Sequence, residues 1–376
     1  MGQVKGALAL LGILALALAR ATLFLPEPRT GVWSVAASLE RPRGYGTALV
    51  VDGGKILVFG GLDLDDPDVT NTTTELIDPA TAKVTTLSGS VAGRLHQTAT
   101  LSKGRLVVAG GVIWSDGRFS STDRVDVFVS AIGKWLPAKP LFQARSDHGA
   151  AALADGRILV TGGNYNATPL ESTEIYDPAA NAWRPAAPLA HPRLRFSIST
   201  LTDGRVLVAG GLDGKGRPLA SSEIYDPRAD AWTAGPDLSV PRVQHVSVDL
   251  PGGDILFIGG QSAASGTAER YDRRTGTFVY AGTLGTPRLV EQAAVLPDGR
   301  VLVAGGSFEK PGRSDWVPFG GAEVWDPRAN AWAPFASPSI PRALGTLVTT
   351  PFGLYLIGGI GAERAPQSLV ERLTFK

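Results

Sequence analysis

Arginine and acidic side chains recur at two places in this 376-residue chain. An arginine stands 16 or 17 residues before each of seven Gly-Gly pairs, and an acid stands two residues before a later, mostly aromatic position. The two sets are Arg43, Arg94, Arg145, Arg193, Arg242, Arg288 and Arg342, and Glu75, Asp126, Glu174, Glu223, Glu269, Glu323 and Glu371. Guanidinium groups bind carboxylate and phosphate in bidentate geometry. The pattern predicts either fixed ion pairs within or between repeats, or arginines of which some bind an anionic or polyhydroxylated ligand.

Three further polar side chains are ligand-binding candidates. Arg195 has no acid at a matching repeat position, so we expect it to be a free cation. His148 and His245 each follow a repeat arginine by three residues and are expected to line the central channel beside it. The histidines are spread over different repeats without the close spacing of metal ligands, so neither a metal nor another cofactor is predicted.

Aromatic residues supply the remaining candidates. Trp114, Tyr165 and Trp316 fall in the longer segments that follow three of the Gly-Gly pairs. Exposed rings beside arginines suit stacking against a sugar or a peptide. The alternative is that these rings pack beneath their own loops. No set of nucleophile, base and orienting group is apparent, so no catalytic residue is predicted.

The elements that position these residues are short strands. Each Gly-Gly pair ends an apolar run, and the pairs recur every 46 to 53 residues. Asp155-Gly156, Asp203-Gly204 and Asp298-Gly299 predict tight hairpins, which we expect to be type I′ turns with positive φ at both central residues. Four strands per repeat and seven repeats predict an all-β protein, a seven-bladed β-propeller of four-stranded antiparallel blades.

The last repeat lacks its outermost strand, and a spare strand stands at the start of the chain. Residues 31–34 include Trp33, whereas the chain stops at Lys376 without an equivalent tryptophan strand. We expect this N-terminal strand to complete the last blade and close the ring, which removes exposed sheet edges. The loop between strands 2 and 3 varies in length from blade to blade, so its face, around the central mouth, is the predicted binding surface.

The repeat resembles the Kelch family. The double glycine is followed by Tyr176 and Trp183 in the third repeat and by Tyr225 and Trp232 in the fourth, which is the spacing that marks Kelch repeats. The resemblance covers nearly all of residues 31–376 and implies a galactose-oxidase-like or Kelch-type propeller, here an exported, bacterial-type member. In Kelch domains that act as ubiquitin-ligase adaptors, arginines at this repeat position contact acidic peptides. The resemblance implies the same use here, although the accompanying serine positions are only partly kept.

Two functions remain open at this point. The first is a non-catalytic binding module for a protein, peptide or glycan, anionic ligands among them, working through the variable loop face. The alternative is a carbohydrate-active enzyme that resembles the sialic-acid mutarotases, in which Glu291 or His245 would serve as acid or base. Those enzymes have six blades, and this chain predicts seven. A copper-radical oxidase is not expected, because its cofactor needs a cysteine and the chain has none.

The first 21 residues resemble a secretory signal. Lys5 precedes an apolar run from Ala7 to Ala19, and residues 19–21 match a cleavage site, so we expect removal after Ala21. The alternative is an uncleaved N-terminal membrane anchor. We expect a secreted or periplasmic monomer, one propeller over residues 31–376, without a membrane span after cleavage. Lys and Arg number 36 against 35 acids and form no basic run, so a nucleic-acid partner is not expected.

Overall fold

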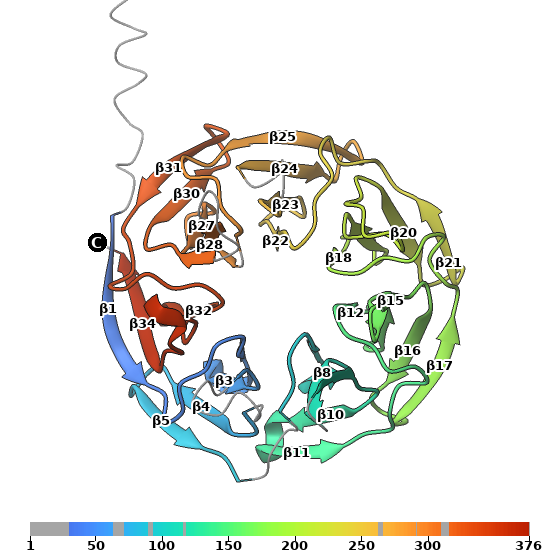
Figure 1. Ribbon diagram of the computed structural model, residues 1–376, viewed down its shortest axis with the longest axis horizontal. Coiled ribbons are helices and arrows are strands. Elements are labelled where there is room, and N and C mark those ends of the chain that lie inside the picture. The colour runs from blue at the N-terminus through green and yellow to red at the C-terminus, as the bar shows by residue number, and fades with distance from the viewer. Residues whose placement is uncertain are drawn as a thin grey trace, which may run out of the picture.

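A computed structural model describes residues 30–62, 71–88, 93–115, 118–261, 266–290, 292–309 and 316–375. In these ranges seven four-stranded antiparallel sheets stand around a central axis (Figure 1). The predicted all-β, seven-bladed propeller is therefore confirmed. Short 3-10 turns, η1 (Asp52–Gly54), η2 (Ser130–Ile132) and η4 (Ala362–Arg364), interrupt the connections. In the described part of the chain, no helix has the length and apolar character needed to cross a membrane.

In each blade the strands run in order from the axis to the rim. Blade 1 consists of β2 (Thr47–Val50), β3 (Ile56–Phe59), β4 (Thr74–Asp78) and β5 (Lys83–Thr86), and blade 2 of β6 (Thr98–Ser102), β7 (Arg105–Ala109), β10 (Val125–Val129) and β11 (Lys134–Pro137). Blade 3 consists of β12 (Gly149–Ala152), β13 (Ile158–Thr161), β16 (Thr173–Asp177) and β17 (Ala182–Ala186). Blade 4 consists of β18 (Ser197–Thr200), β19 (Val206–Ala209), β20 (Ser222–Asp226) and β21 (Ala231–Ala234). Blade 5 consists of β22 (Val246–Asp249), β23 (Ile255–Ile258), β24 (Thr267–Asp272) and β25 (Thr277–Thr283). Blade 6 consists of β26 (Ala293–Val295), β27 (Val301–Ala304), β30 (Ala322–Asp326) and β31 (Ala331–Phe335). Blade 7 consists of β32 (Thr346–Thr350), β33 (Gly353–Ile357), β34 (Leu369–Phe375) and β1 (Gly31–Ser38).

The hydrophobic core lies between blades. The second strand of a blade is apolar on consecutive residues, and all four residues of β19 are buried. Both faces of such a strand must be covered, and neighbouring blades cover them. Each cluster of buried side chains joins two adjacent blades; for example, Phe59 of blade 1 packs in one cluster with Phe128 of blade 2. The ring is therefore stabilised at every blade boundary, including the boundary between blades 7 and 1.

The N-terminal strand closes the ring as predicted. β1 pairs antiparallel with β34, and Trp33 stands opposite Leu373. The indole nitrogen of Trp33 donates to the carbonyl of Ala336, which follows the outer strand of blade 6, at 2.8 Å. Trp232 makes the equivalent bond to Ala187 at 2.9 Å. The outer tryptophan of a blade thus binds the preceding blade, and Trp33 does this for blade 7.

The Gly-Gly pairs are needed where one blade meets the next. Gly210 and Gly211 have φ of 71° and 96°, which residues with a Cβ rarely adopt. A Cβ on Gly210 would lie 2.6 Å from the carbonyl oxygen of Arg242 in the next blade. The amide of Gly211 donates to that same carbonyl at 2.8 Å. The pair therefore permits a backbone approach between blades that a side chain would block.

The Asp-Gly hairpins differ from the predicted type I′ turns. At Asp155-Gly156 only the glycine has positive φ, 97°. The amide of Gly156 donates to the carbonyl of Leu153 at 2.9 Å, and the amide of Leu153 donates to the backbone carbonyl of Arg157 at 2.8 Å. This is the pattern of a three-residue hairpin loop that ends in a left-handed glycine. The aspartate need not adopt positive φ, because the extra residue already turns the chain.

Short hairpins extend three of the loops between strands 2 and 3. They are β8–β9, β14–β15 and β28–β29, in blades 2, 3 and 6 (Figure 1). Their strands are β8 (Val112–Ser115), β9 (Arg118–Ser121), β14 (Asn164–Tyr165), β15 (Thr168–Pro169), β28 (Ser307–Glu309) and β29 (Trp316–Pro318). Each hairpin begins beside the segment that enters the innermost strand of its blade; in blade 3, for example, Asn164 of β14 forms a bridge with Ser146, which precedes β12. The hairpins therefore lie on the face predicted to bind a ligand.

Candidate functional site

The seven repeat arginines lie inside the blades. In blade 4, Arg193 Nη2 donates to Glu223 Oε1 at 2.8 Å, and Nη1 donates to the carbonyls of Gly210 and Ser221, both at 3.0 Å. The second carboxylate oxygen accepts from the amide of Ala190, in the link from blade 3, at 2.7 Å. One buried ion pair therefore connects the Gly-Gly turn, strand 3 and the incoming link.

The same ion pair is present in every blade. The pairs are Arg43 with Glu75, Arg94 with Asp126, Arg145 with Glu174, Arg193 with Glu223, Arg242 with Glu269, Arg288 with Glu323, and Arg342 with Glu371. The arginine side chains are at most 1% exposed. Burial lowers the pKa of Arg94 to about 10, so it stays protonated at neutral pH. The ion-pair alternative thus describes all seven, and the expectation that some are open to a ligand is corrected: none reaches solvent.

His148 and His245 also hold blades together. The Nε2 of His148 lies 2.9 Å from Thr98 Oγ1 of the preceding blade, and that of His245 lies 2.6 Å from Ser197 Oγ. Gln97 fills the same place in blade 2, with its amide 3.2 Å from Thr47 Oγ1. Both histidines are 8% exposed, so the expectation that they line the channel is corrected: they lie in the boundaries between blades.

Burial keeps both histidines neutral. Desolvation, with a nearby arginine, lowers the pKa of His148 and of His245 to about 3. Each Nδ1 is buried without a hydrogen-bond partner among the described residues, so protonation there would bury an unsatisfied donor. His245 is accordingly a poor acid or base at neutral pH, and Glu291, the other residue considered for that role, lies outside the described residues.

Acid is expected to destabilise the propeller through these two histidines. Because their folded pKa is below the unfolded value of about 6.5, the unfolded state takes up protons first as the pH falls. Stability is full above pH 6.5 and is lost toward pH 3, by up to about 1.4 kcal/mol per pH unit for each histidine. The double variant His148→Gln/His245→Gln should flatten this dependence in urea titrations between pH 7 and pH 4. Glutamine should fit at both positions, because Gln97 already stands at the equivalent position of blade 2. An unchanged dependence of stability on pH would contradict the assignment of the effect to these two histidines.

A ring of six residues surrounds the axis where the chain enters the innermost strands. Each member stands two residues after a repeat arginine; we call this set, Tyr45, His96, Asp147, Arg195, Gln244 and Leu344, the axial ring. All six have φ between 52° and 57°. In blade 6 the equivalent residue, Val290, is 1% exposed and packs in the core between blades 5 and 6 instead. The amide of Arg195 donates to the carbonyl of Asp147 at 3.0 Å, and that of Gln244 donates to Arg195 at 3.1 Å. Non-glycine residues in this conformation cost roughly 1–3 kcal/mol each and cluster at functional sites.

Asp147 is the centre of the polar part of the axial ring. Its carboxylate lies 3.0 Å from His96 Nδ1 and 3.5 Å from Arg195 Nε, which come from the two adjacent blades. Asn164 Nδ2 donates to it at 3.1 Å. Burial opposes its ionisation, yet the hydrogen bond from His96 and the charges of His96 and Arg195 lower the pKa of Asp147 below its usual value. Arg195 is therefore paired, which corrects the expectation of a free cation. Its partner Asp147 stands two residues after Arg145, the repeat arginine of the preceding blade.

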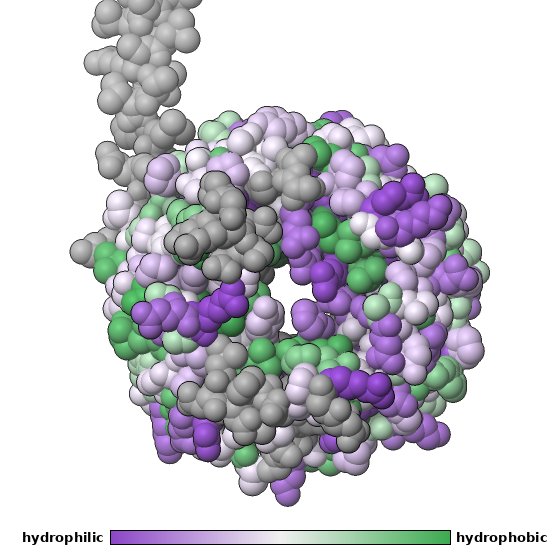
Figure 2. All heavy atoms as spheres, viewed as in Figure 1, coloured by the Kyte–Doolittle hydropathy of each residue, from purple (hydrophilic) through white to green (hydrophobic). Residues whose placement is uncertain are grey.

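The outer ends of the polar residues reach solvent. The side chains of His96 and Arg195 are 33% and 36% exposed, against 12% for Asp147. The rings of Tyr45 and His96 lie 6.0 Å apart. In Figure 2 the central opening is bordered by hydrophilic residues along one part of its rim and by hydrophobic residues along another. Sequence reasoning missed Tyr45, Asp147 and Gln244; their constant distance from the repeat arginines was the available signal.

The three aromatic candidates have different surroundings. Trp114 packs edge-on against Phe119 of its own hairpin, with ring centroids 4.7 Å apart. Trp316 lies beneath Arg364 of blade 7, whose guanidinium carbon is 5.8 Å from the ring centroid. Tyr165 is 45% exposed. Packing beneath its own loop therefore describes Trp114, whereas Trp316 lies against a residue of the neighbouring blade. Of these three aromatic residues, only Tyr165 is exposed.

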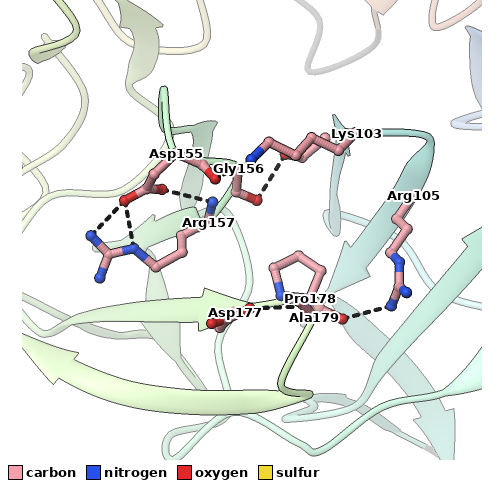
Figure 3. Close-up of a pocket in the computed structure, with 9 residues that line it drawn as sticks. Lys103, Arg105, Asp155, Gly156, Arg157, Asp177, Pro178 and Ala179 are labelled. Carbon is pink, nitrogen blue, oxygen red and sulfur yellow. Dashed lines mark hydrogen bonds and ion pairs between the residues drawn. The ribbon is translucent and has the colours of Figure 1, made fainter.

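A pocket of about 320 Å³ lies on the opposite face, between blades 2 and 3. Lys103 reaches the carbonyl of Asp155, and Arg105 Nη1 donates to the carbonyl of Pro178 at 2.6 Å (Figure 3). Arg157 and Asp155 form an ion pair at 2.7 Å. The basic groups of this pocket thus join neighbouring turns, and we do not place the ligand site here. Nowhere in the described ranges do three His, Cys, Asp or Glu residues form a group that could hold a metal ion.

Comparison with known proteins agrees with this architecture. The family model described as Kelch motif matches residues 144–190 and 199–239. The chain is thus a closed seven-bladed β-propeller with Kelch repeats in blades 3 and 4. No curated protein was found to match the chain.

Solved structures share the fold. One is a fungal alcohol oxidase of the AA5 family in complex with copper, with a TM-score of 0.71 and 21% identity. The match covers 92% of this chain and 76% of the oxidase. The likeness concerns the fold alone.

Proposed function

We propose that this Kelch-repeat propeller is a non-catalytic binding module for a protein, peptide or glycan, and that the ligand lies over the axial ring on the face of the hairpins. The observation that carries the proposal is the division of the axial ring. Polar residues from blades 1 to 5 stand together, and Leu344 of blade 7 adds an apolar side chain to the ring. A rigid surface with convergent polar groups beside an apolar part is typical of ligand sites.

The charged part of the axial ring supports recognition of a polar or anionic group. Asp147 orients Arg195 by an ion pair at 3.5 Å, while more than a third of the Arg195 side chain remains exposed. A guanidinium held in place loses little entropy when it binds a carboxylate or hydroxyl group. The apolar start of the chain supports the further proposal that this module acts outside the cytoplasm.

Replacement of Arg195 tests this proposal. Purified protein would be screened against a peptide library and a glycan array, and each retained ligand would then be titrated. Arg195→Gln is expected to weaken binding roughly tenfold, about the contribution of one charge-assisted contact. Arg205→Gln is the matched control, because Arg205 is 43% exposed and pairs with Asp203 on the opposite face. Absence of any ligand, or equal loss in both variants, would contradict the proposal.

A further inference from the structure

A groove of about 400 Å³ separates the hairpins of blades 2 and 3 on the same face. Arg118, Phe119, Ser120 and Ser121 line it from β9, and Asn164 and Asn166 line it from the β14–β15 hairpin. This volume falls within the range of small-molecule sites, about 300–1,000 Å³. We call it the hairpin groove.

Hydrogen bonds hold the two walls of the hairpin groove in fixed positions. The amide of Ser121 donates to Asn166 Oδ1 at 2.9 Å, and the amide of Asn166 donates to Ser121 Oγ at 3.1 Å. Asn166 and Ala167 both have positive φ, 46° and 71°, as a two-residue type I′ turn requires. Since walls that are already ordered lose little entropy on binding, the hairpin groove is preorganised for a ligand.

The floor of the hairpin groove is joined to the axial ring. Asn164 Oδ1 accepts from the amide of Ala167 at 3.0 Å, and Asn164 Nδ2 donates to Asp147 at 3.1 Å. One asparagine therefore connects the turn of the hairpin with the charged centre of the site described above. The hairpin groove and the axial ring therefore lie on the same face and are linked through Asn164.

The lining combines an exposed aromatic ring with neutral hydrogen-bonding groups. Phe119 is 46% exposed and is supported edge-on by Trp114. The hydroxyl of Ser120 and the side-chain amide of Asn166 can both donate and accept hydrogen bonds, whereas the Ser121 hydroxyl already contacts Asn166 and Asn164. Among the described residues, no carboxylate lines the groove. Arg118 is exposed and forms no ion pair with any residue in the described ranges.

This chemistry matches a sugar ring, which presents an apolar C–H face to an aromatic side chain and hydroxyl groups at its edge. We propose that the hairpin groove binds a sugar unit, with Phe119 beneath the ring and Arg118 beside a hydroxyl or carboxylate. An extended peptide is less suited, because strand addition needs open backbone amides and Asn166 already occupies that of Ser121. The inference rests on the proposed function, since it names a ligand class for the same face.

Free monosaccharides test the inference. Wild-type protein would be mixed with glucose, galactose, N-acetylglucosamine and N-acetylneuraminic acid, and binding would be read by saturation-transfer NMR. We expect at least one sugar to bind, and Phe119→Ala to weaken its affinity roughly tenfold. Phe352→Ala is the matched control, because Phe352 is also an exposed phenylalanine, 39% exposed, and lies in the turn between β32 and β33 on the opposite face. It should bind as wild type does.

Two further variants separate the possible results. Asn166→Gly keeps the left-handed turn and removes the side chain, so it should weaken the sugar as Phe119→Ala does. If an acidic sugar is preferred, Arg118→Gln should remove that preference. No sugar signal, or equal loss in Phe119→Ala and Phe352→Ala, would overturn the inference. A ligand that depends on Arg195 but is indifferent to Phe119 would leave the proposed function standing and reject only the sugar site.

Discussion

Replacement of Arg193 by alanine is expected to lower the free energy of unfolding by about 3–5 kcal/mol, the usual cost of breaking a buried ion pair. The variant would leave the Glu223 carboxylate buried without its cation and the carbonyl of Gly210 without its donor, whereas the carbonyl of Ser221 would keep its bond from the amide of Gly210. The second loss adds to the first, because unsatisfied buried acceptors are costly. Urea-induced unfolding, followed by tryptophan fluorescence and circular dichroism, measures the effect.

Two controls accompany this measurement. Arg205→Ala removes an exposed ion pair with Asp203 and is expected to cost no more than about 1 kcal/mol. Arg193→Met combined with Glu223→Leu removes both charges and should recover part of the loss, since no charge is then stranded. If Arg193→Ala were as mild as Arg205→Ala, the buried pairs would not be structural, and the repeat arginines would again need a functional explanation.

Removal of β1, residues 31–38, is expected to abolish the single cooperative unfolding transition. β34 would become an open edge, and blade 7 would lose the Trp33 contact with Ala336 of blade 6. Each lost backbone hydrogen bond costs about 1 kcal/mol, and an open strand edge promotes association. Calorimetry and size-exclusion chromatography should show a broadened transition and aggregates.

A point variant in the same strand separates closure from other effects of β1. Val35→Thr changes a side chain that is 63% exposed and leaves the strand in place, so it should unfold like the wild type. Trp33→Ala should fall between the two, because it removes one inter-blade hydrogen bond and the packing of one large ring. A wild-type melting profile for the β1 deletion would contradict the closure.

Both predictions concern contacts of a kind that the amino-acid sequence partly discloses. Repeated arginines and acids in equal number implied pairing, although their spacing left two pairings and a ligand role open. The structure selects the acid of the same blade, because strand 3 lies beside the Gly-Gly turn that the arginine also binds. The orphan tryptophan at position 33 identified the closing strand, because its equivalents in other blades come at a regular distance.

The sequence by itself determined the number of blades, the strand order and the closing strand. These features depend on local chemistry: Gly-Gly pairs whose positive φ residues with a Cβ rarely adopt, apolar runs that must be covered on both faces, and turns after short strands. The tertiary structure alone decided that the seven arginines are buried, that His148 and His245 hold blades together, and that Asp147 joins His96 to Arg195. The contacts of His148, His245 and Asp147 join residues about 50 positions apart in neighbouring blades. The packing of the blades around the ring, rather than local spacing, brings these residues together.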